Sequence, residues 1–370
     1  MGAAPVSGRL RVVVVGPAPA QAASRGGMAT VVTLMAAHPD QRVEIVMVPT
    51  YIEGSLGYRL WVGGSGMLRA TWMVLRRRAD VLHVHLAHGG SVLRKALPLA
   101  AARLARVPAV VHAHSYDFGG WFDRLPGVMR PVVRRMLVAD RWLVLGARHV
   151  EEYARRLRLP AERITVLHNA VAIPPSGVAQ AEVEPVHAVS LGRLGVRKGS
   201  YDLIAGVAAL DENLRDRLRL TLAGDGEVDE VRAAVSAAGL DRTIVVAGWL
   251  DPKARDELLG RAQLFVLPSY DEGLPMALLE AMARGLAPVT TLVGSIGEAV
   301  RDRENGLVVQ PGRPDQIAEA LTELLKDDTL RASLGAAARS RANDFGLDRW
   351  YQRLTDIWTS AMHPPGGGTP

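Results

Sequence analysis

Twelve short runs of Val, Ile, Leu and Ala alternate with longer stretches of helical periodicity along this chain, and this alternation restricts the fold more than any other feature. The runs lie at residues 11–15, 43–48, 81–85, 109–112, 141–145, 164–167, 186–191, 218–223, 243–247, 264–267, 287–290 and 306–309. The helical stretches lie at 30–37, 92–104, 148–157, 201–209, 227–238, 253–260, 316–325, 329–344 and 347–361. Strands that alternate with helices favour βαβ units and parallel sheets covered on both faces.

A chain of 370 residues suits two α/β domains rather than one core. The stretch AIPPSGVAQAEVEP is rich in Pro and Ala and lacks helical periodicity, which is typical of a linker. We predict an α/β protein with two Rossmann-like, doubly wound parallel-sheet domains at 1–172 and 186–345, joined by a linker at 173–185. A helix at 346–362 and a disordered, Pro/Gly-rich tail at 363–370 follow.

The composition excludes several protein classes. Apolar residues make up 48 % and charged residues 22 %, as in globular proteins. No apolar run reaches the about 20 residues that span a bilayer. The absence of cysteine excludes disulfides, Cys-ligated metals and thiol catalysis, and it favours a cytoplasmic location.

Positive charge is concentrated in the first half of the chain. Residues 1–175 hold 23 Lys and Arg against 10 Asp and Glu, whereas the rest holds 21 against 28. This asymmetry predicts an anionic partner for the first half, such as membrane lipid at the inner face of the plasma membrane or a phosphorylated acceptor. An Arg-rich coding bias is the alternative, because 40 of the 44 basic residues are Arg. The basic residues are not interleaved with aromatics, so we expect no nucleic-acid partner.

The motif SRGGM at residues 24–28 follows the first predicted strand. Adjacent glycines before a helix let backbone N–H groups approach an anionic ligand. A plain tight turn is the alternative, because the motif is neither a G-x-G-x-x-G fingerprint nor a Walker loop.

The motif GRLGVRKG at residues 192–199 follows the first strand of the second half. A doubly wound fold binds its ligand at such a loop, so Arg193 and Lys198 are placed to direct two cations at one site. Arg offers a planar fork to phosphate oxygens and Lys a point charge, which together suit a diphosphate. A solvated basic turn is the alternative.

The motif EGLPMALLE at residues 272–280 follows the strand at 264–267. Pro275 suits the first turn of a helix, which we predict over 276–283. Glu272 then precedes a helix N-terminus, and Glu280 lies in an otherwise apolar segment. A buried carboxylate needs hydrogen-bond partners, which sugar or ribose hydroxyls supply. A capping acid plus an exposed Glu is the alternative.

The motif HAHSYD at residues 112–117 begins where a predicted strand ends, which places His114 at the carboxyl edge of the first sheet. A structural histidine is the alternative. His83 and His85 alternate along one strand, which predicts a shared face, but no acidic ligands accompany them and we expect no metal site.

Taken together, these motifs resemble the retaining glycosyltransferases of the family 4 type, which have the two-domain GT-B fold and include bacterial mannosyltransferases and glucosyltransferases. GRLGVRKG, GDG at residues 224–226 and EGLPMALLEAMARGLAPV carry the resemblance, and Glu272 and Glu280 meet the Glu-x7-Glu spacing. SRGGM, HAHSYDF and VLHNAV extend it over essentially the whole chain. Ser295 and Ile296 depart from the small, Gly-containing variants that are common there.

The resemblance implies roles for individual residues. The implied catalytic residues are His114, Arg193, Lys198 and Glu272. The implied donor-binding residues are Gly27, Arg193, Lys198, Gly248, Trp249, Glu272, Gly273, Leu274, Pro275 and Glu280. Arg25, Tyr116 and Lys95 are expected on the acceptor side. The helix at 347–361 is expected to cross back to the first domain.

The implied activity is transfer of a hexosyl unit, with retention and without a metal or other cofactor, from a UDP- or GDP-sugar to a hydroxyl group of the acceptor. We expect a saccharide, lipid-linked or small-molecule acceptor, in cell-envelope, exopolysaccharide or glycoconjugate synthesis. A non-catalytic relative and a nucleotide-sugar epimerase are the alternatives.

Overall fold

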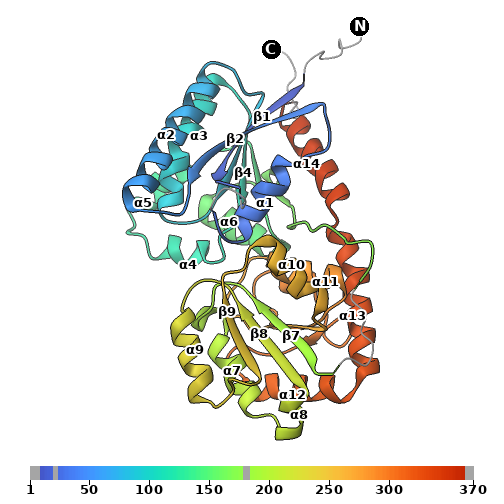
Figure 1. The fold of residues 1–370 in the computed structure, drawn as a ribbon. Coiled ribbons are helices and arrows are strands. Elements are labelled where there is room, and N and C mark those ends of the chain that lie inside the picture. The colour runs from blue at the N-terminus through green and yellow to red at the C-terminus, as the bar shows by residue number, and fades with distance from the viewer. Residues whose placement is uncertain (1–8, 20–23, 178–183, 363–370) are drawn as a thin grey trace. The chain divides into compact units, whose positions relative to one another are not determined.

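The computed structural model describes residues 9–19, 24–177 and 184–362, which form two compact units (Figure 1). Unit 1 comprises Met1–His168 and Asp348–Pro370, and unit 2 comprises Asn169–Leu347. The predicted tail at 363–370 and residues 178–183 of the predicted linker lie outside the described residues.

Unit 1 is built on a six-stranded sheet in the order β2-β1-β3-β4-β5-β6. Its strands are β1 Leu10–Pro17, β2 Val43–Tyr51, β3 Val81–Leu86, β4 Ala109–Ala113, β5 Arg141–Val144 and β6 Ile164–Val166. All its neighbouring strands pair in parallel. The chain order reverses between β1 and β3, and their carboxyl ends therefore flank the ligand position of a doubly wound fold.

Helices cover both faces of this sheet (Figure 1). They are α1 Gly27–Ala36, α2 Leu56–Leu75, α3 Gly90–Ala105, α4 Phe118–Asp123, α5 Met129–Met136, α6 Ala147–Leu157 and α14 Leu347–Met362. Successive side chains of a strand point to opposite faces. Leu82 and Val84 of β3 accordingly pack in one core with Met73 of α2 and Leu99 of α3, whereas His83 and His85 face the other way.

The helix α2 was not predicted, because Gly57, Gly63, Gly64 and Gly66 lower its helix propensity. Tertiary packing explains one of these glycines. A Cβ atom at Gly66 would lie 1.9 Å from the carbonyl oxygen of Pro49, so only glycine lets α2 approach β2 this closely.

Unit 2 repeats the architecture with a six-stranded parallel sheet in the order β12-β11-β10-β7-β8-β9. Its strands are β7 Val186–Leu191, β8 Leu218–Ala223, β9 Ile244–Gly248, β10 Leu264–Leu267, β11 Ala287–Thr290 and β12 Leu307–Val308. Its helices are α7 Ser200–Ala208, α8 Glu212–Asp216, α9 Val228–Ala237, α10 Pro252–Arg261, α11 Met276–Arg284, α12 Pro314–Lys326 and α13 Asp328–Ala342. The chain order reverses between β7 and β10, the strands that precede the two strongest motifs.

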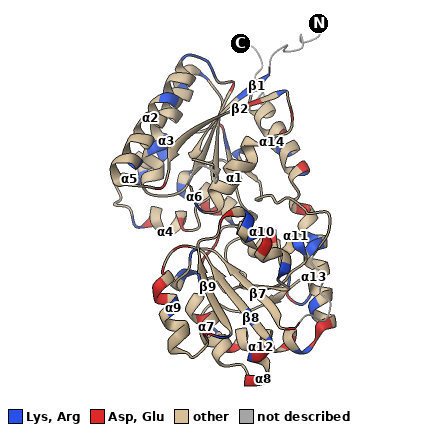
Figure 2. Cartoon of the chain, viewed as in Figure 1, with Lys and Arg blue, Asp and Glu red and all other residues tan. Residues whose placement is uncertain are grey.

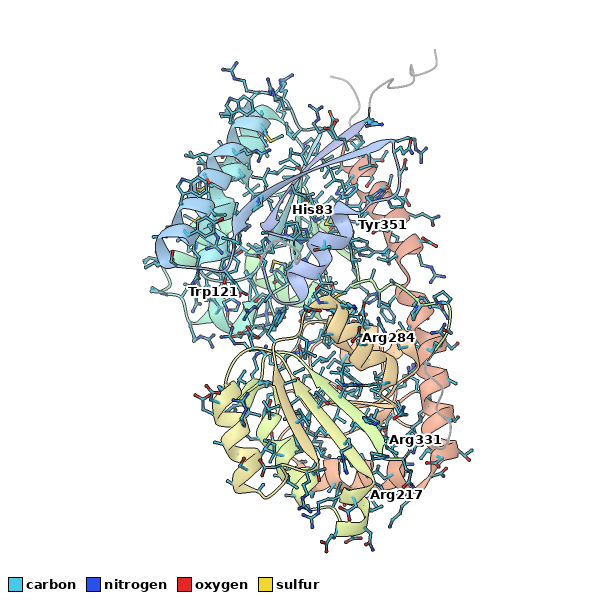
Figure 3. The ribbon with its side chains drawn as sticks, in the orientation of Figure 1. His83, Trp121, Arg217, Arg284, Arg331 and Tyr351 are labelled. Carbon is cyan, nitrogen blue, oxygen red and sulfur yellow. The ribbon has the colours of Figure 1, made fainter. Side chains whose placement is uncertain are left out.

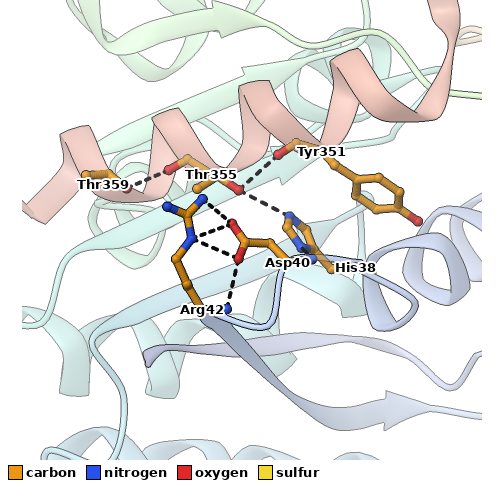
Figure 4. A network of polar contacts seen from close by, with 6 residues as sticks. All are labelled: His38, Asp40, Arg42, Tyr351, Thr355 and Thr359. Atoms are coloured by element: carbon orange, nitrogen blue, oxygen red, sulfur yellow. Dashed lines mark hydrogen bonds and ion pairs between the residues drawn. The ribbon is translucent and has the colours of Figure 1, made fainter. Parts of the chain in front are cut away.

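The last helix, α14, packs within unit 1 although it follows unit 2 in sequence. Tyr351 donates a hydrogen bond from its hydroxyl group to the Leu34 carbonyl (2.7 Å), and the Trp358 indole N–H donates to Nδ1 of His83 (3.0 Å). Figure 4 shows a third contact, between Thr355 Oγ1 and Nε2 of His38 (3.2 Å), next to the Asp40–Arg42 ion pair. These contacts fix α14 against α1, the segment that follows α1, and β3.

All twelve predicted strands are confirmed to within three residues at either end, and both sheets are parallel as expected. The pattern succeeded because strands buried on both faces read as short apolar runs. Beside α2, the short helices α4, α5 and α8 were also missed.

Candidate active site

The loops that follow β7 and β10 meet at the carboxyl edge of the unit 2 sheet, and an ion pair joins them. The Lys198 ammonium contacts the Glu272 carboxylate, which also accepts a hydrogen bond from the Ser269 hydroxyl group (2.8 Å). Only 13 % of the Lys198 side chain and 7 % of the Glu272 side chain are exposed. Two residues 74 positions apart, each predicted at the site, are thus neighbours.

Hydrogen bonds to backbone carbonyl groups also join the same two loops. Arg197 donates from its guanidinium to the Asp271 carbonyl (2.9 Å), and the Tyr270 N–H donates to the Arg197 carbonyl (2.9 Å). Gly199 has φ +68°, and a Cβ atom there would lie 2.2 Å from the Pro268 carbonyl oxygen. Glycine is therefore required at this close approach. Arg197 and Ser269 were not predicted, because their contacts arise only when β7 and β10 become neighbours.

Two further loops complete this edge. The Ser295 N–H donates to the Gly273 carbonyl (2.7 Å), and the Leu194 N–H donates to the Asp225 carbonyl within GDG (2.6 Å). The Gly224 N–H in turn donates to the carbonyl of Gly248, the last residue of β9 (2.7 Å). Trp249, an implied donor-binding residue, follows Gly248 and is 46 % exposed.

Arg193 differs from Lys198, because it is exposed. Among the described residues, its guanidinium has no hydrogen bond or ion pair with another side chain. The GRLGVRKG loop therefore carries Lys198, which Glu272 holds in place, and Arg193, which is open to a ligand. This is an arrangement that suits a diphosphate.

Glu280 lies on α11 and is 7 % exposed, as its apolar neighbours predicted. Burial raises the pKa of its carboxyl group, and the Arg255 guanidinium, 3.4 Å away on α10, opposes that shift. Arg255 was not predicted, since nothing in the sequence indicates which helix lies beside α11. Pro275 is the residue just before α11 rather than in its first turn, and the buried Leu274 accepts a hydrogen bond at its carbonyl from the Asn169 amide (2.7 Å).

In unit 1, Gly27 is the first residue of α1, and it follows Gly26, which has φ +94°. Its position at a helix N-terminus agrees with the anion-binding reading of SRGGM. Arg25, predicted on the acceptor side, forms an ion pair with Glu53 (3.3 Å).

His114 lies just beyond β4 at the same edge of the unit 1 sheet, beside three buried histidines. Nδ1 of His85 lies 2.8 Å from Nε2 of His114, and Nε2 of His85 lies 3.0 Å from the sulfur of Met35. Both nitrogens of His112 and Nε2 of His83 have no hydrogen-bond partner among the described residues. Burial lowers the pKa of all four imidazoles, to about 3 for His83 and for His114.

The nitrogens of His83, His85 and His112 lie within 4.8 Å of one another, a grouping close enough to test as a metal site. The Trp358 N–H occupies Nδ1 of His83, so the proton of the neutral ring lies on Nε2. Neither nitrogen of His83 then offers a lone pair to a cation. Figure 3 labels His83 on the unit 1 sheet and Tyr351 on α14, which covers this face.

Two predicted acceptor-side residues have different surroundings. Tyr116 is 41 % exposed, and its ring makes a T-shaped contact with the His88 ring. Lys95 is only 2 % exposed, and its ammonium donates to Thr50 Oγ1 (2.7 Å). The Lys95 ammonium therefore lies in the interior of unit 1, and its place on the acceptor side stays a prediction. The helix pattern gave its position but not the face on which it lies.

The two halves of the chain match two described families. Residues 12–173 match "Glycosyltransferase Family 4", and residues 178–341 match "Glycosyl transferases group 1". The chain is 30 % identical to the glycogen synthase of Mycobacterium tuberculosis, over 77 % of this chain and 69 % of that protein. It is 26 % identical to the alpha-D-kanosaminyltransferase of Streptomyces kanamyceticus, over 86 % and 88 %.

A solved structure shows the same fold. The Anabaena protein Alr3699/HepE, solved in complex with UDP, superposes with a TM-score of 0.72 at 17 % identity, over 95 % of this chain and all of that one. With two parallel-sheet units, both family matches and these relatives, this chain belongs to glycosyltransferase family 4 and is a glycosyltransferase with the GT-B fold.

Proposed function

We propose that this glycosyltransferase moves a hexosyl unit from a nucleoside diphosphate sugar to an acceptor hydroxyl group, with retention of anomeric configuration and without a metal ion. The observation that supports the proposal is the Lys198–Glu272 ion pair, because it joins the cation proposed to bind phosphate to the carboxylate proposed to bind sugar hydroxyl groups.

The leaving group is the first requirement of such a reaction. As the sugar–phosphate bond breaks, negative charge develops on the diphosphate, and preorganised cations stabilise it. Arg193 and Lys198 supply two positive charges from one loop, and no Asp-x-Asp motif occurs in the sequence to hold a metal. Two cations for the diphosphate and no motif for a metal together support a metal-independent reaction.

Retention is proposed to follow a front-side displacement. In this mechanism the acceptor hydroxyl attacks from the face that the diphosphate leaves, and the departing phosphate oxygen takes the hydroxyl proton. His114 is proposed to contact the donor sugar, and Glu272 its hydroxyl groups. Glu280 is proposed to bind the ribose, since a hydroxyl pair satisfies a buried carboxylate.

We favour UDP as the donor nucleotide, because the similar Anabaena protein was solved with UDP and with UDP-glucose. GDP is the alternative. We propose a saccharide, a lipid-linked or a small-molecule acceptor. The names of two relatives, a glycogen synthase and a kanosaminyltransferase, agree with part of this range of acceptors. A non-catalytic relative or an epimerase is less well supported, because Arg193, Lys198 and Glu272 are all present.

Thermal unfolding of the full chain with UDP, GDP, ADP or TDP, with and without magnesium, tests the donor proposal. A ligand that binds only the native state raises the melting temperature. We expect UDP to raise it without magnesium. No shift with any diphosphate at saturating concentration would favour the non-catalytic alternative. Proton NMR of the first-formed product tests retention, and an inverted linkage would overturn the front-side mechanism.

A further inference from the structure

The helices α2 and α3 of unit 1 carry large apolar side chains on the face turned away from the sheet. These are Trp61, Leu68 and Trp72 on α2 and Leu93, Leu97 and Leu104 on α3, here called the α2–α3 face. Their exposed fractions range from 40 % for Leu97 to 79 % for Leu104. Both sets recur at helical spacing, so each forms a continuous stripe along its helix.

The inner face of α2 is also apolar. Val62, Ala70 and Met73 are buried there. A surface helix of a soluble protein usually has a polar outer face, whereas α2 is apolar on two opposite faces. The helices α2 and α3 pack against one another, and the two stripes therefore combine into a surface that intramolecular packing does not explain.

The charge around this face has one sign. Residues 54–116 contain nine Lys and Arg, of which Lys95 is buried, and only one acidic residue, Asp80. Arg69 and Arg76 to Arg78 are exposed on α2 or just after it, and the Arg78 guanidinium lies over the Trp72 ring, 4.5 Å from its centroid. Figure 2 shows Lys and Arg along both helices. A second copy of this face would bring like charges together, whereas an anionic surface would be attracted.

No helix among the described residues is long and apolar enough to cross a membrane. Tryptophan and leucine flanked by arginine are instead the composition of helices that lie in the headgroup region of a bilayer. Because the inner face of α2 is held in the core, this helix has only its outer stripe to offer to lipid.

We propose that the α2–α3 face docks on the surface of an anionic lipid bilayer. This inference goes beyond the proposed reaction, because it rests on no donor-site residue. Both helices begin at the carboxyl edge of the parallel sheet, the edge that carries His114. A bilayer bound by this face therefore lies close to the edge where the sheet binds ligands.

Flotation of the purified full chain with vesicles tests the proposal. We expect binding to vesicles of phosphatidylcholine mixed with phosphatidylglycerol, and little binding to phosphatidylcholine alone. The variant W61E/L68E should lower the partition coefficient by more than about tenfold, since it removes two apolar side chains from contact with lipid. Val245→Glu is the matched control, because Val245 is 55 % exposed on β9 of unit 2, and it should bind like the wild type.

A charge variant separates lipid from other occupants. Replacing Arg76 and Arg77 by Gln should weaken binding to anionic vesicles about tenfold or more, since each arginine adds to the attraction to anionic lipid. Equal binding of wild type and W61E/L68E, or no binding of wild type to anionic vesicles, would overturn the proposal. So would sedimentation equilibrium showing a wild-type dimer that W61E/L68E dissociates, because the face would then join two copies of this chain. Circular dichroism confirms that each variant is folded.

Discussion

Nδ1 of the buried His85 lies 2.8 Å from Nε2 of His114, so a core histidine is hydrogen-bonded to the histidine proposed to contact the donor sugar. The Met35 sulfur only accepts hydrogen bonds, and Nε2 of His85 must therefore donate to it. With its ring neutral, His85 accepts at Nδ1, and His114 donates from Nε2. This arrangement leaves Nδ1 of His114 as an acceptor for a sugar hydroxyl group.

His85→Leu should therefore impair catalysis through His114. We expect kcat to fall about tenfold, since removing one oriented hydrogen bond costs roughly 1–1.5 kcal/mol. Adding His85→Leu to His114→Ala should cause little further loss, because the two residues act as one unit. Steady-state kinetics of the two single variants and the double variant measure this coupling. Additive losses would contradict a positioning role.

Lys198→Met should abolish most turnover, because it removes one of two cations from the departing diphosphate. Loss of such a group lowers kcat by roughly 10²–10³-fold. Lys326→Met, on an exposed position of α12, is the matched control and should keep wild-type activity. A Lys198→Met variant that is folded and fully active would remove the diphosphate assignment.

Gly199→Ala should weaken nucleotide binding by displacing the GRLGVRKG loop. The added Cβ atom would meet the Pro268 carbonyl oxygen, and left-handed backbone costs about 1–2 kcal/mol for alanine. Gly239→Ala is the control, because Gly239 has φ +67° but nothing within 4 Å of its Cβ position. Titration calorimetry with UDP should show weaker binding only for Gly199→Ala, whereas both variants should lose stability.

Stability should fall at acidic pH because of the four histidines. Their pKa values are lowered in the folded state, to about 3 for His83 and His114, whereas unfolded histidine titrates near 6.5. Between about pH 6.5 and pH 3, the unfolded chain therefore binds more protons than the folded chain. The free energy of unfolding accordingly decreases as the pH falls through this range. Urea unfolding between pH 7 and pH 5 measures the slope. His112→Leu should reduce it by up to about 1.4 kcal/mol per pH unit, and an unchanged slope would contradict the assignment.

Lys95→Met should stabilise the protein at neutral pH. Burial lowers the pKa of Lys95 to about 7, against about 10.4 when unfolded. Between about pH 7 and pH 10.4, the Lys95 amine is protonated in the unfolded chain but not in the folded chain. The free energy of unfolding therefore rises with pH over this range. Removing the amine should remove that rise and add roughly 1–3 kcal/mol near pH 7. Lys326→Met should change neither quantity, and a destabilised Lys95→Met variant would contradict the prediction.

Local patterns predicted the strands because each is a short apolar run with a clear end. They did not predict α2, whose glycines oppose a helix in isolation but permit close packing on β2. Local patterns also did not predict which side chains become partners. The sequence marked Glu280 as buried, yet its partner Arg255 comes from a helix whose position is set by the whole unit. Lys95 was expected on the acceptor side and its side chain is buried, a burial that helical periodicity alone does not indicate.

The sequence by itself determined the two parallel-sheet units, the strand positions and the motif residues Arg193, Lys198 and Glu272, because strand patterning and loop chemistry are local properties. Only the tertiary structure decided that Lys198 meets Glu272, that His85 fixes His114 and that α2 has a second, outward apolar face. These relationships depend on strand order and on which helix covers which face. Both follow from the packing of segments far apart in the chain, where a residue's neighbours in sequence say little about its neighbours in space.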